Sequence, residues 1–175
     1  VLLPSDSRQV FVADVSSGFY SFVTNSNTDP RRSGDVDANF TVADWMDLRA
    51  VLSDMDVDTS FQALEIGASD GLILLATKNI IVKSPDHGVS WQKLSILPSE
   101  EQDLVTAVAI DPQNSNNLYY GTGLTFARST DGGVTWSNIK LPTKRAVSEI
   151  LIDYRHPNNI YLGVNSGPGT GLIFK

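Results

Sequence analysis

The feature that most restricts the fold of this chain is an internal repeat. An eight-residue pattern occurs twice, as SPDHGVSW (Ser84–Trp91) and STDGGVTW (Ser129–Trp136), 45 positions apart. A further tryptophan, Trp45, lies 46 positions before Trp91. Self-similarity at a fixed spacing indicates that the chain folds as a series of similar units.

Each unit contains the same order of strand-like segments. Four short runs rich in β-branched and aromatic residues carry a small residue at their fourth position: VFVAD (Ala13), ILLAT (Ala76), LYYGT (Gly121) and IYLGV (Gly163). A run of alternating polar and apolar residues precedes each of the last three of these runs. A further strand-like run follows each of the four, and a segment that begins at Trp45, Trp91 or Trp136 gives the fourth strand of the first three units. Four short strands in a repeat of this length predict the blade of a β-propeller. We therefore predict an all-β fold of four-stranded antiparallel blades, about four in number with the last incomplete, within a larger propeller.

We expect residues 1–175 to form one partial propeller with approximate blades at 1–53, 54–98, 99–142 and 143–175. The first blade carries an insertion at residues 24–43, whose Asp, Asn, Ser, Gly and Pro composition predicts a surface loop. Asp35, Asp37 and Asn39 are spaced like the first ligands of a calcium-binding loop, although Phe40 and Met46 replace the glycine and glutamate that such a loop needs. The sequence is compatible with a plain polar loop and with a weak calcium site.

The repeated pattern resembles the Asp-box, Ser-x-Asp-x-Gly-x-x-Trp. This motif marks the Asp-box (BNR-repeat) β-propeller superfamily, which includes sialidases, sortilin-type receptors and xyloglucan-hydrolysing propellers. The matching residues are Ser84, Asp86, Gly88 and Trp91 in the first copy, and Ser129, Asp131, Gly133 and Trp136 in the second. The resemblance implies that these residues hold a turn at the blade periphery, away from any catalytic centre.

Composition excludes several functions. The chain has 13 basic against 20 acidic residues, and the basic residues are scattered, so we expect no nucleic-acid partner. There is no cysteine, which excludes disulfides and thiolate metal sites. No apolar run is long enough to predict a membrane span, and nothing in the sequence predicts a cofactor or a metal site beyond the weak calcium candidates.

Candidate catalytic residues are few. Glu65 and Glu149 interrupt predicted innermost strands, so both are candidates to face a central channel, either as a solvated wall or as functional groups. Asp70 and Asp111 follow such strands, where a carboxylate capping a turn is expected. His87 and His156 are expected at the surface. The sialidase arginine triad and Arg-Ile-Pro motif have no counterpart, and we assign no catalytic residue.

Two functional hypotheses follow. The first is a non-enzymatic, extracytoplasmic propeller module, secreted, periplasmic or at the cell surface, that binds a protein or a glycan. The alternative is a fragment of a glycoside hydrolase resembling the xyloglucan-hydrolysing propellers. A third possibility is a purely structural segment, which is expected to have no cleft. In each case the remaining blades, or a partner chain, are expected to cover the open strand edges.

Overall fold

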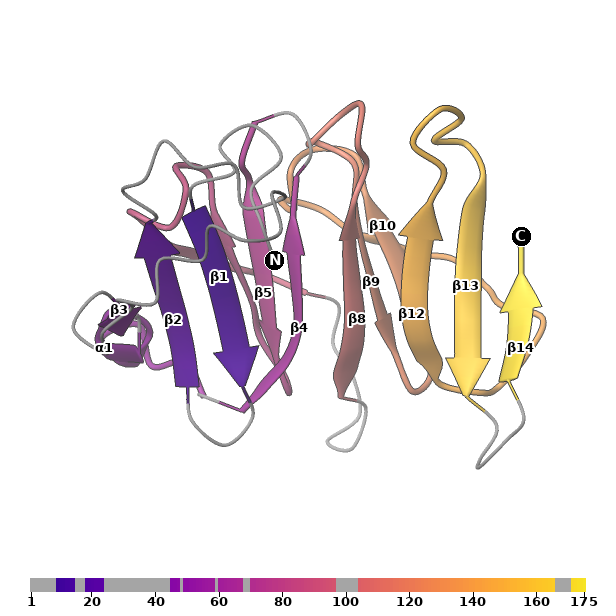
Figure 1. The fold of residues 1–175 in the computed structure, drawn as a ribbon. Helices are drawn as coiled ribbons and strands as arrows, with labels where there is room; N and C mark the ends of the chain where they lie inside the picture. The colour runs from indigo at the N-terminus through magenta and orange to yellow at the C-terminus, as the bar shows by residue number, and fades with distance from the viewer. Residues whose placement is uncertain are drawn as a thin grey trace, which may run out of the picture.

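The computed structural model describes residues 9–14, 18–23, 45–47, 49–58, 60–67, 70–96, 104–165 and 171–175. These residues form four antiparallel β-sheets, one after another along the chain, with one short helix (Figure 1). We call the sheets blades 1 to 4. The predicted all-β fold of propeller blades is confirmed, and the blades form an open arc.

Successive strands pair with their neighbours in every blade. Blade 1 contains β1 (Gln9–Asp14), β2 (Gly18–Val23) and β3 (Trp45–Asp47), followed by α1 (Arg49–Ser53). Blade 2 contains β4 (Phe61–Ile66), β5 (Ile73–Thr77), β6 (Ile81–Ser84) and β7 (Gln92–Leu94). Blade 3 contains β8 (Val105–Ile110), β9 (Leu118–Thr122), β10 (Phe126–Ser129) and β11 (Ser137–Asn138). Blade 4 contains β12 (Val147–Ile152), β13 (Ile160–Asn165) and β14 (Gly171–Phe174).

Strand register defines which residues are equivalent between blades. The small residue at the fourth position of each repeated run pairs with a residue of the strand that follows it, and the pair occupies the same place in every blade. The pairs are Ala13–Phe19, Ala76–Ile81, Gly121–Phe126 and Gly163–Ile173. By this register β1 corresponds to the second strands β5, β9 and β13. Within the described residues, blade 1 therefore has second to fourth strands, and blade 4 has first to third.

The first strands β4, β8 and β12 lie side by side at the inner edge of the arc (Figure 1). Each contains a β-bulge at the same place, between Phe61 and Ala63, Val105 and Ala107, and Val147 and Glu149. A bulge inserts one residue and changes which face the next side chain occupies. Phe61 therefore belongs to the core on one side of blade 2, whereas Ala63 packs against the core on the other.

The hydrophobic core is divided into clusters that lie between blades, as expected for a repeat architecture. Side chains of blades 2 and 3 fill one cluster, with Leu74, Ala76, Val105 and Val108 among its members. Side chains of blades 3 and 4 fill the next, which includes Ala109 and Val147.

The helix α1 is a feature that the sequence did not predict. We expected only a strand after Trp45, but the chain turns into α1 after β3. Leu52 of this helix is completely buried and packs with Phe61 and Ile73 of blade 2. Tertiary burial of one leucine thus stabilises a helix too short to form alone.

Candidate functional site

The first Ser-x-Asp turn connects β6 to β7 and is closed by its own side chains. Ser84 Oγ donates to Asp86 Oδ1 at 3.0 Å and accepts from the Gly88 N–H at 2.7 Å. Asp86 also accepts from the Ser90 N–H at 2.8 Å and from the Ser90 hydroxyl at 2.6 Å. The two side chains together satisfy the backbone of the turn, which would otherwise need water.

The second turn, between β10 and β11, repeats this geometry. Ser129 Oγ donates to Asp131 Oδ1 at 2.7 Å and accepts from the Gly133 N–H at 2.8 Å. Asp131 accepts from the Thr135 N–H at 2.9 Å and from the Thr135 hydroxyl at 2.5 Å. These hydrogen bonds lower the pKa of Asp131 to about 2, and the bonds from Ser90 lower that of Asp86. Both groups are therefore held as carboxylates, which suits a turn acceptor and not a general acid.

Backbone conformation explains the glycines of the turns. Gly88 and Gly133 have φ of 89° and 92°, in the region where a side chain is strained. The preceding position also has positive φ, and is Gly132 (71°) in blade 3 but His87 (60°) in blade 2. A Cβ on Gly71 would lie 2.2 Å from His87 Cε1, so the imidazole lies directly against that glycine. His87 is thus an exposed residue whose ring packs on the connection before β5.

The tryptophan that ends each turn packs against a core cluster between blades. Trp91 lies against the cluster containing Phe61, and its Nε1 donates to Gly88 O at 3.0 Å. Trp136 lies against the cluster of blades 2 and 3, edge-on to Tyr120 with ring centroids 4.8 Å apart. Within the described residues its buried Nε1 has no hydrogen-bond partner. The two turns therefore differ at the indole nitrogen.

A lysine ties blade 2 to the turn of blade 3. Lys83 Nζ donates to Gly132 O at 2.6 Å, across 49 residues of sequence. Burial lowers the pKa of Lys83, and the Asp131 carboxylate opposes that shift. This contact was not predicted, although the sequence contains a signal for it: IVK, FAR and IFK place Lys83, Arg128 and Lys175 at one position of the repeat.

Glu65 lies on β4, beside Leu74 of β5. It shares this side of blade 2 with Ala63 and Ala76, which is the side that packs on blade 3. The carboxyl group is partly buried and forms no hydrogen bond with another described residue. Burial alone raises its pKa to about 7, so it titrates near neutral pH, where a general acid–base group operates.

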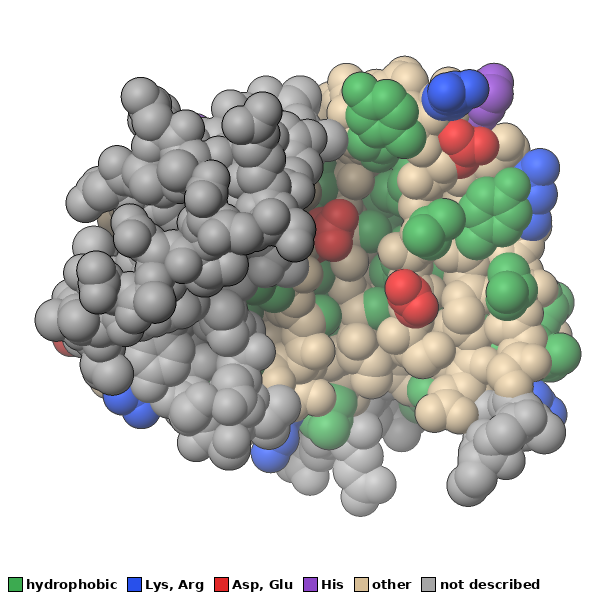
Figure 2. All heavy atoms as spheres, in the orientation of Figure 1, with side chains coloured by type: hydrophobic (Ala, Val, Ile, Leu, Met, Phe, Trp, Pro, Cys, Tyr) green, Lys and Arg blue, Asp and Glu red, His purple; other side chains and the backbone are tan. Residues whose placement is uncertain are grey.

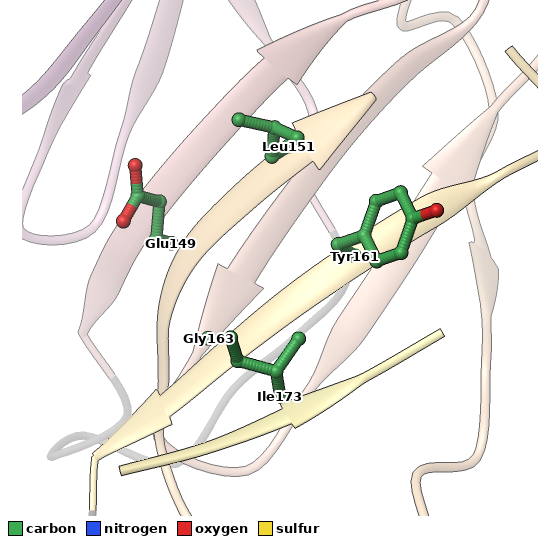
Figure 3. Close-up of a pocket in the computed structure, with 5 residues that line it drawn as sticks. All are labelled: Glu149, Leu151, Tyr161, Gly163 and Ile173. Carbon is green, nitrogen blue, oxygen red and sulfur yellow. The ribbon is translucent and has the colours of Figure 1, made fainter. Parts of the chain in front are cut away.

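Glu149 has a different environment. It is exposed on β12 and lines a shallow pocket of about 380 Å³ with Leu151, Tyr161, Gly163 and Ile173. Figure 3 shows these side chains on one face of blade 4, with Glu149 and Leu151 from β12, Tyr161 from β13 and Ile173 from β14. This face is turned away from blade 3, because Ile150 and Leu162 occupy the opposite face and belong to the core shared with blade 3.

The structure therefore does not bring the two glutamates together. Glu65 is on the side of blade 2 that packs on blade 3, and Glu149 is on the open side of blade 4. By register Glu65 corresponds to Ala109 and Leu151, whereas Glu149 corresponds to Ala63 and Ala107. Both residues lie after the bulge and on the equivalent side of their blades, so their different exposure arises because blade 3 covers this side of blade 2.

The remaining candidates are turn residues or lie elsewhere. Asp70 accepts from the Leu72 N–H at 3.2 Å and Asp111 from the Gln113 N–H at 2.9 Å, which confirms the expected capped turns. Asp35, Asp37 and Asn39 lie outside the described residues. In the described part of the chain, no cluster of three or more acidic or histidine side chains could hold a metal ion, and no helix is long and apolar enough to cross a membrane.

Comparison with known proteins points to xyloglucanases. No family model matches the chain. Among curated proteins, it is similar to xyloglucanase Xgh74A of Acetivibrio thermocellus, with 38% identity over 74 residues, and to a xyloglucanase of Hypocrea jecorina, with 35% identity over 83 residues. These matches cover 38% and 37% of this chain but 9% and 10% of those proteins. The matches therefore span about a tenth of the relatives' length.

Solved structures share the fold over nearly the whole chain. The GH74 xyloglucanase from Xanthomonas campestris aligns with a TM-score of 0.66 and 13% identity, covering 99% of this chain and 28% of that one. An ancestral GH74 enzyme gives 0.65 at 18% identity, covering 94% and 21%. The extracellular domain of a putative hybrid two-component system from B. thetaiotaomicron gives 0.60 at 12%, covering 97% and 20%. At these identities the likeness concerns the fold.

Proposed function

We propose that this chain forms part of the propeller of an extracytoplasmic glycoside hydrolase that acts on xyloglucan. The observation that carries the proposal is the 38% identity over 74 residues with a xyloglucanase. The fold over most of the chain, shared with GH74 enzymes, is consistent with it. In this proposal the two Ser-x-Asp turns are Asp-boxes with a structural role.

Glu65 is the group in the described residues whose chemistry best suits such an enzyme. Glycoside hydrolysis needs a carboxylic acid that stays protonated until it reaches the leaving-group oxygen. Burial gives Glu65 a pKa of about 7, so a substantial fraction carries a proton at neutral pH. A second carboxylate on the opposite side of the substrate is also required.

The second candidate is the non-enzymatic binding module, and one observation favours it. Glu65 and Glu149 are on the equivalent sides of blades 2 and 4, with blade 3 between them, so these two glutamates do not form the facing pair that hydrolysis needs. A module with this arrangement would hold a glycan without cleaving it.

One experiment separates the two functions. Xyloglucan oligosaccharides are titrated into the chain by calorimetry, and release of reducing ends is measured in parallel. Hydrolysis that Glu65→Gln abolishes, while the control Glu149→Gln keeps it, supports the enzyme with Glu65 as its acid. Binding without release supports the module, and no interaction with xyloglucan contradicts the hydrolase.

A further inference from the structure

The connection between blades 3 and 4, residues 139–146, carries a cluster of positive charge. It runs from β11, at the outer edge of blade 3, to β12, the first strand of blade 4. Three of its side chains are exposed cations, Lys140, Lys144 and Arg145, and it contains no acidic residue. In a chain of net charge −7 this segment is a local positive surface, and we call it the cationic connection.

The corresponding connections between the other blades have the opposite charge. Three exposed aspartates lie between blades 1 and 2, namely Asp54, Asp56 and Asp58. Three acidic residues, which lie outside the described residues, occur in the sequence between blades 2 and 3, namely Glu100, Glu101 and Asp103. Connections of the same kind thus carry either sign of charge. The blades themselves therefore do not require the positive charge of the cationic connection.

The backbone of the cationic connection is fixed at both ends and in the middle. The N–H of Ile139 donates to a carbonyl of β10 at 2.7 Å, and the carbonyl of Ala146 accepts from an N–H of β13 at 3.1 Å. Leu141 packs against the core cluster of blades 3 and 4. Thr143 Oγ1 accepts from the Arg145 N–H at 3.2 Å, which holds the backbone beside two of the cations. A connection that is already ordered loses little further entropy when a ligand binds.

The three cations make no contact of their own within the described residues. None of their side chains forms a hydrogen bond or an ion pair with another described residue, whereas Lys83 donates to the turn of blade 3. On the side of the molecule drawn in Figure 2, the Lys and Arg side chains lie apart from one another along its edges. The cationic connection is therefore a concentration of charge that the protein does not use internally.

The chemistry of this surface fits a glycan that carries carboxylate groups. A guanidinium group binds a carboxylate through two parallel hydrogen bonds, and an ammonium group attracts it as a point charge. Leu124 is 64% exposed and Ile139 37% exposed, and both lie next to Phe126, by sequence or by hydrogen bonding. They offer apolar area for the C–H face of a sugar ring, but much less than the ~1,000 Å² that a protein interface needs. Duplex DNA is usually held by about six to ten phosphate contacts, which is more than three cations supply.

We propose that the cationic connection is a binding site for an acidic, uronate-bearing polysaccharide. Lys140, Lys144 and Arg145 pair with carboxylates of the glycan, and the apolar side chains beside them contact its sugar rings. Xyloglucan is uncharged, so this site is separate from the hydrolysis proposed above. The inference goes beyond that function and holds for either of the two candidate functions.

The test compares two forms of one ligand. An oligogalacturonate and its fully methyl-esterified form, which has the same sugar rings without the charge, are titrated into the chain by calorimetry. We expect the acidic form to bind at least ~10-fold more tightly than the ester, and its affinity to fall as the salt concentration rises. Equal binding of the two forms, or no binding of the acidic form, would overturn the proposal.

Substitutions locate the site. Lys144→Gln combined with Arg145→Gln should weaken binding of the acidic form by about tenfold, because two exposed ion pairs are lost. The control combines Arg155→Gln with Lys175→Gln, which removes the same charge at exposed positions elsewhere in blade 4 and should leave the affinity unchanged. Equal losses in the two double variants would show that net charge, and not this site, governs binding. An oligoglutamate that binds the parent as tightly as the oligogalacturonate would overturn the assignment to a glycan in favour of an acidic protein.

A measurement on the unsubstituted chain keeps the proposal testable if a double variant does not fold. Exposed lysines are acetylated with and without the oligogalacturonate, and mass spectrometry gives the rate at each lysine. Lys140 and Lys144 should react several-fold more slowly when the acidic ligand is bound, whereas Lys175 should react at an unchanged rate. Protection of Lys175 without protection of Lys144 would overturn the location of the site.

Discussion

At the scale of single residues, Glu65 makes stability depend on pH. The unfolded chain releases this proton near the usual pKa of 4.5, whereas the folded chain releases it near 7. Between these values the folded state binds more protons than the unfolded state, so stability falls as pH rises. We expect Glu65→Gln to raise the free energy of unfolding by about 1–3 kcal/mol at pH 8 and to change it little at pH 4. Urea denaturation at both pH values measures this, with exposed Glu149→Gln as the control, and an equal effect of Glu65→Gln at both pH values would contradict it.

The two tryptophans offer a matched pair of substitutions. Trp91→Phe removes the hydrogen bond to Gly88 O, whereas Trp136→Phe removes an indole N–H that has no partner among the described residues. Both variants lose a similar ring volume next to a core cluster. Trp91→Phe should therefore reduce the free energy of unfolding by about 1 kcal/mol more than Trp136→Phe. Chemical denaturation of the two variants measures the difference, and a larger loss for Trp136→Phe would show that its packing on Tyr120 dominates.

The residues of the turns were predictable, whereas the difference in burial between Glu65 and Glu149 was not. Ser84, Asp86 and Gly88 form a local structure whose hydrogen bonds connect residues two to four positions apart. Local chemistry of this kind is visible in a sequence pattern. The environment of Glu65 depends on a bulge three residues earlier and on a neighbouring blade, and neither leaves a local signal.

At the scale of elements, Lys83 connects the third strand of blade 2 to the turn of blade 3. Lys83→Met keeps most of the side-chain volume and removes the donor, so the Gly132 carbonyl loses its partner from blade 2. We expect a loss of about 1 kcal/mol in the free energy of unfolding, with faster hydrogen exchange at the Gly133 amide. The exposed Lys140→Met serves as the control. Unchanged exchange at Gly133 would show that the turn is held without Lys83.

Strand order was predictable because each blade repeats it, and the repeat also predicted the packing of one blade on the next. The helix α1 was not predicted, because it is stabilised by packing of Leu52 in a core cluster with residues of blade 2, and a local sequence pattern does not show that contact. The pairing of Lys83 with another blade was not predicted for the same reason. Contacts between blades depend on how the blades are arranged in the arc, and the sequence of a single segment does not predict that arrangement.

At the scale of the whole molecule, the arc is built from interfaces between blades that are consecutive in the sequence. The insertion at 24–43 lies outside the described residues. Strand register also shows that the insertion replaces a turn. Phe22 lies opposite Trp45 in blade 1, at the position that Ser84 and Trp91 occupy in blade 2. Blade 2 makes the same connection with only Pro85–Ser90.

Residues 23–44 can therefore be replaced by Pro-Asp-His-Gly-Val-Ser, together with Phe22→Ser, to give blade 1 the turn of blade 2. We expect the variant to unfold cooperatively with a free energy of unfolding about 1 kcal/mol higher, because a shorter loop costs less entropy to close. Thermal unfolding with and without calcium measures both this gain and the role of Asp35, Asp37 and Asn39. A calcium-dependent rise in Tm that occurs in the parent and disappears in the variant would identify those residues as ligands. Loss of cooperative unfolding in the variant would instead show that the insertion contributes to the core, which would contradict the interpretation of residues 24–43 as a polar surface loop.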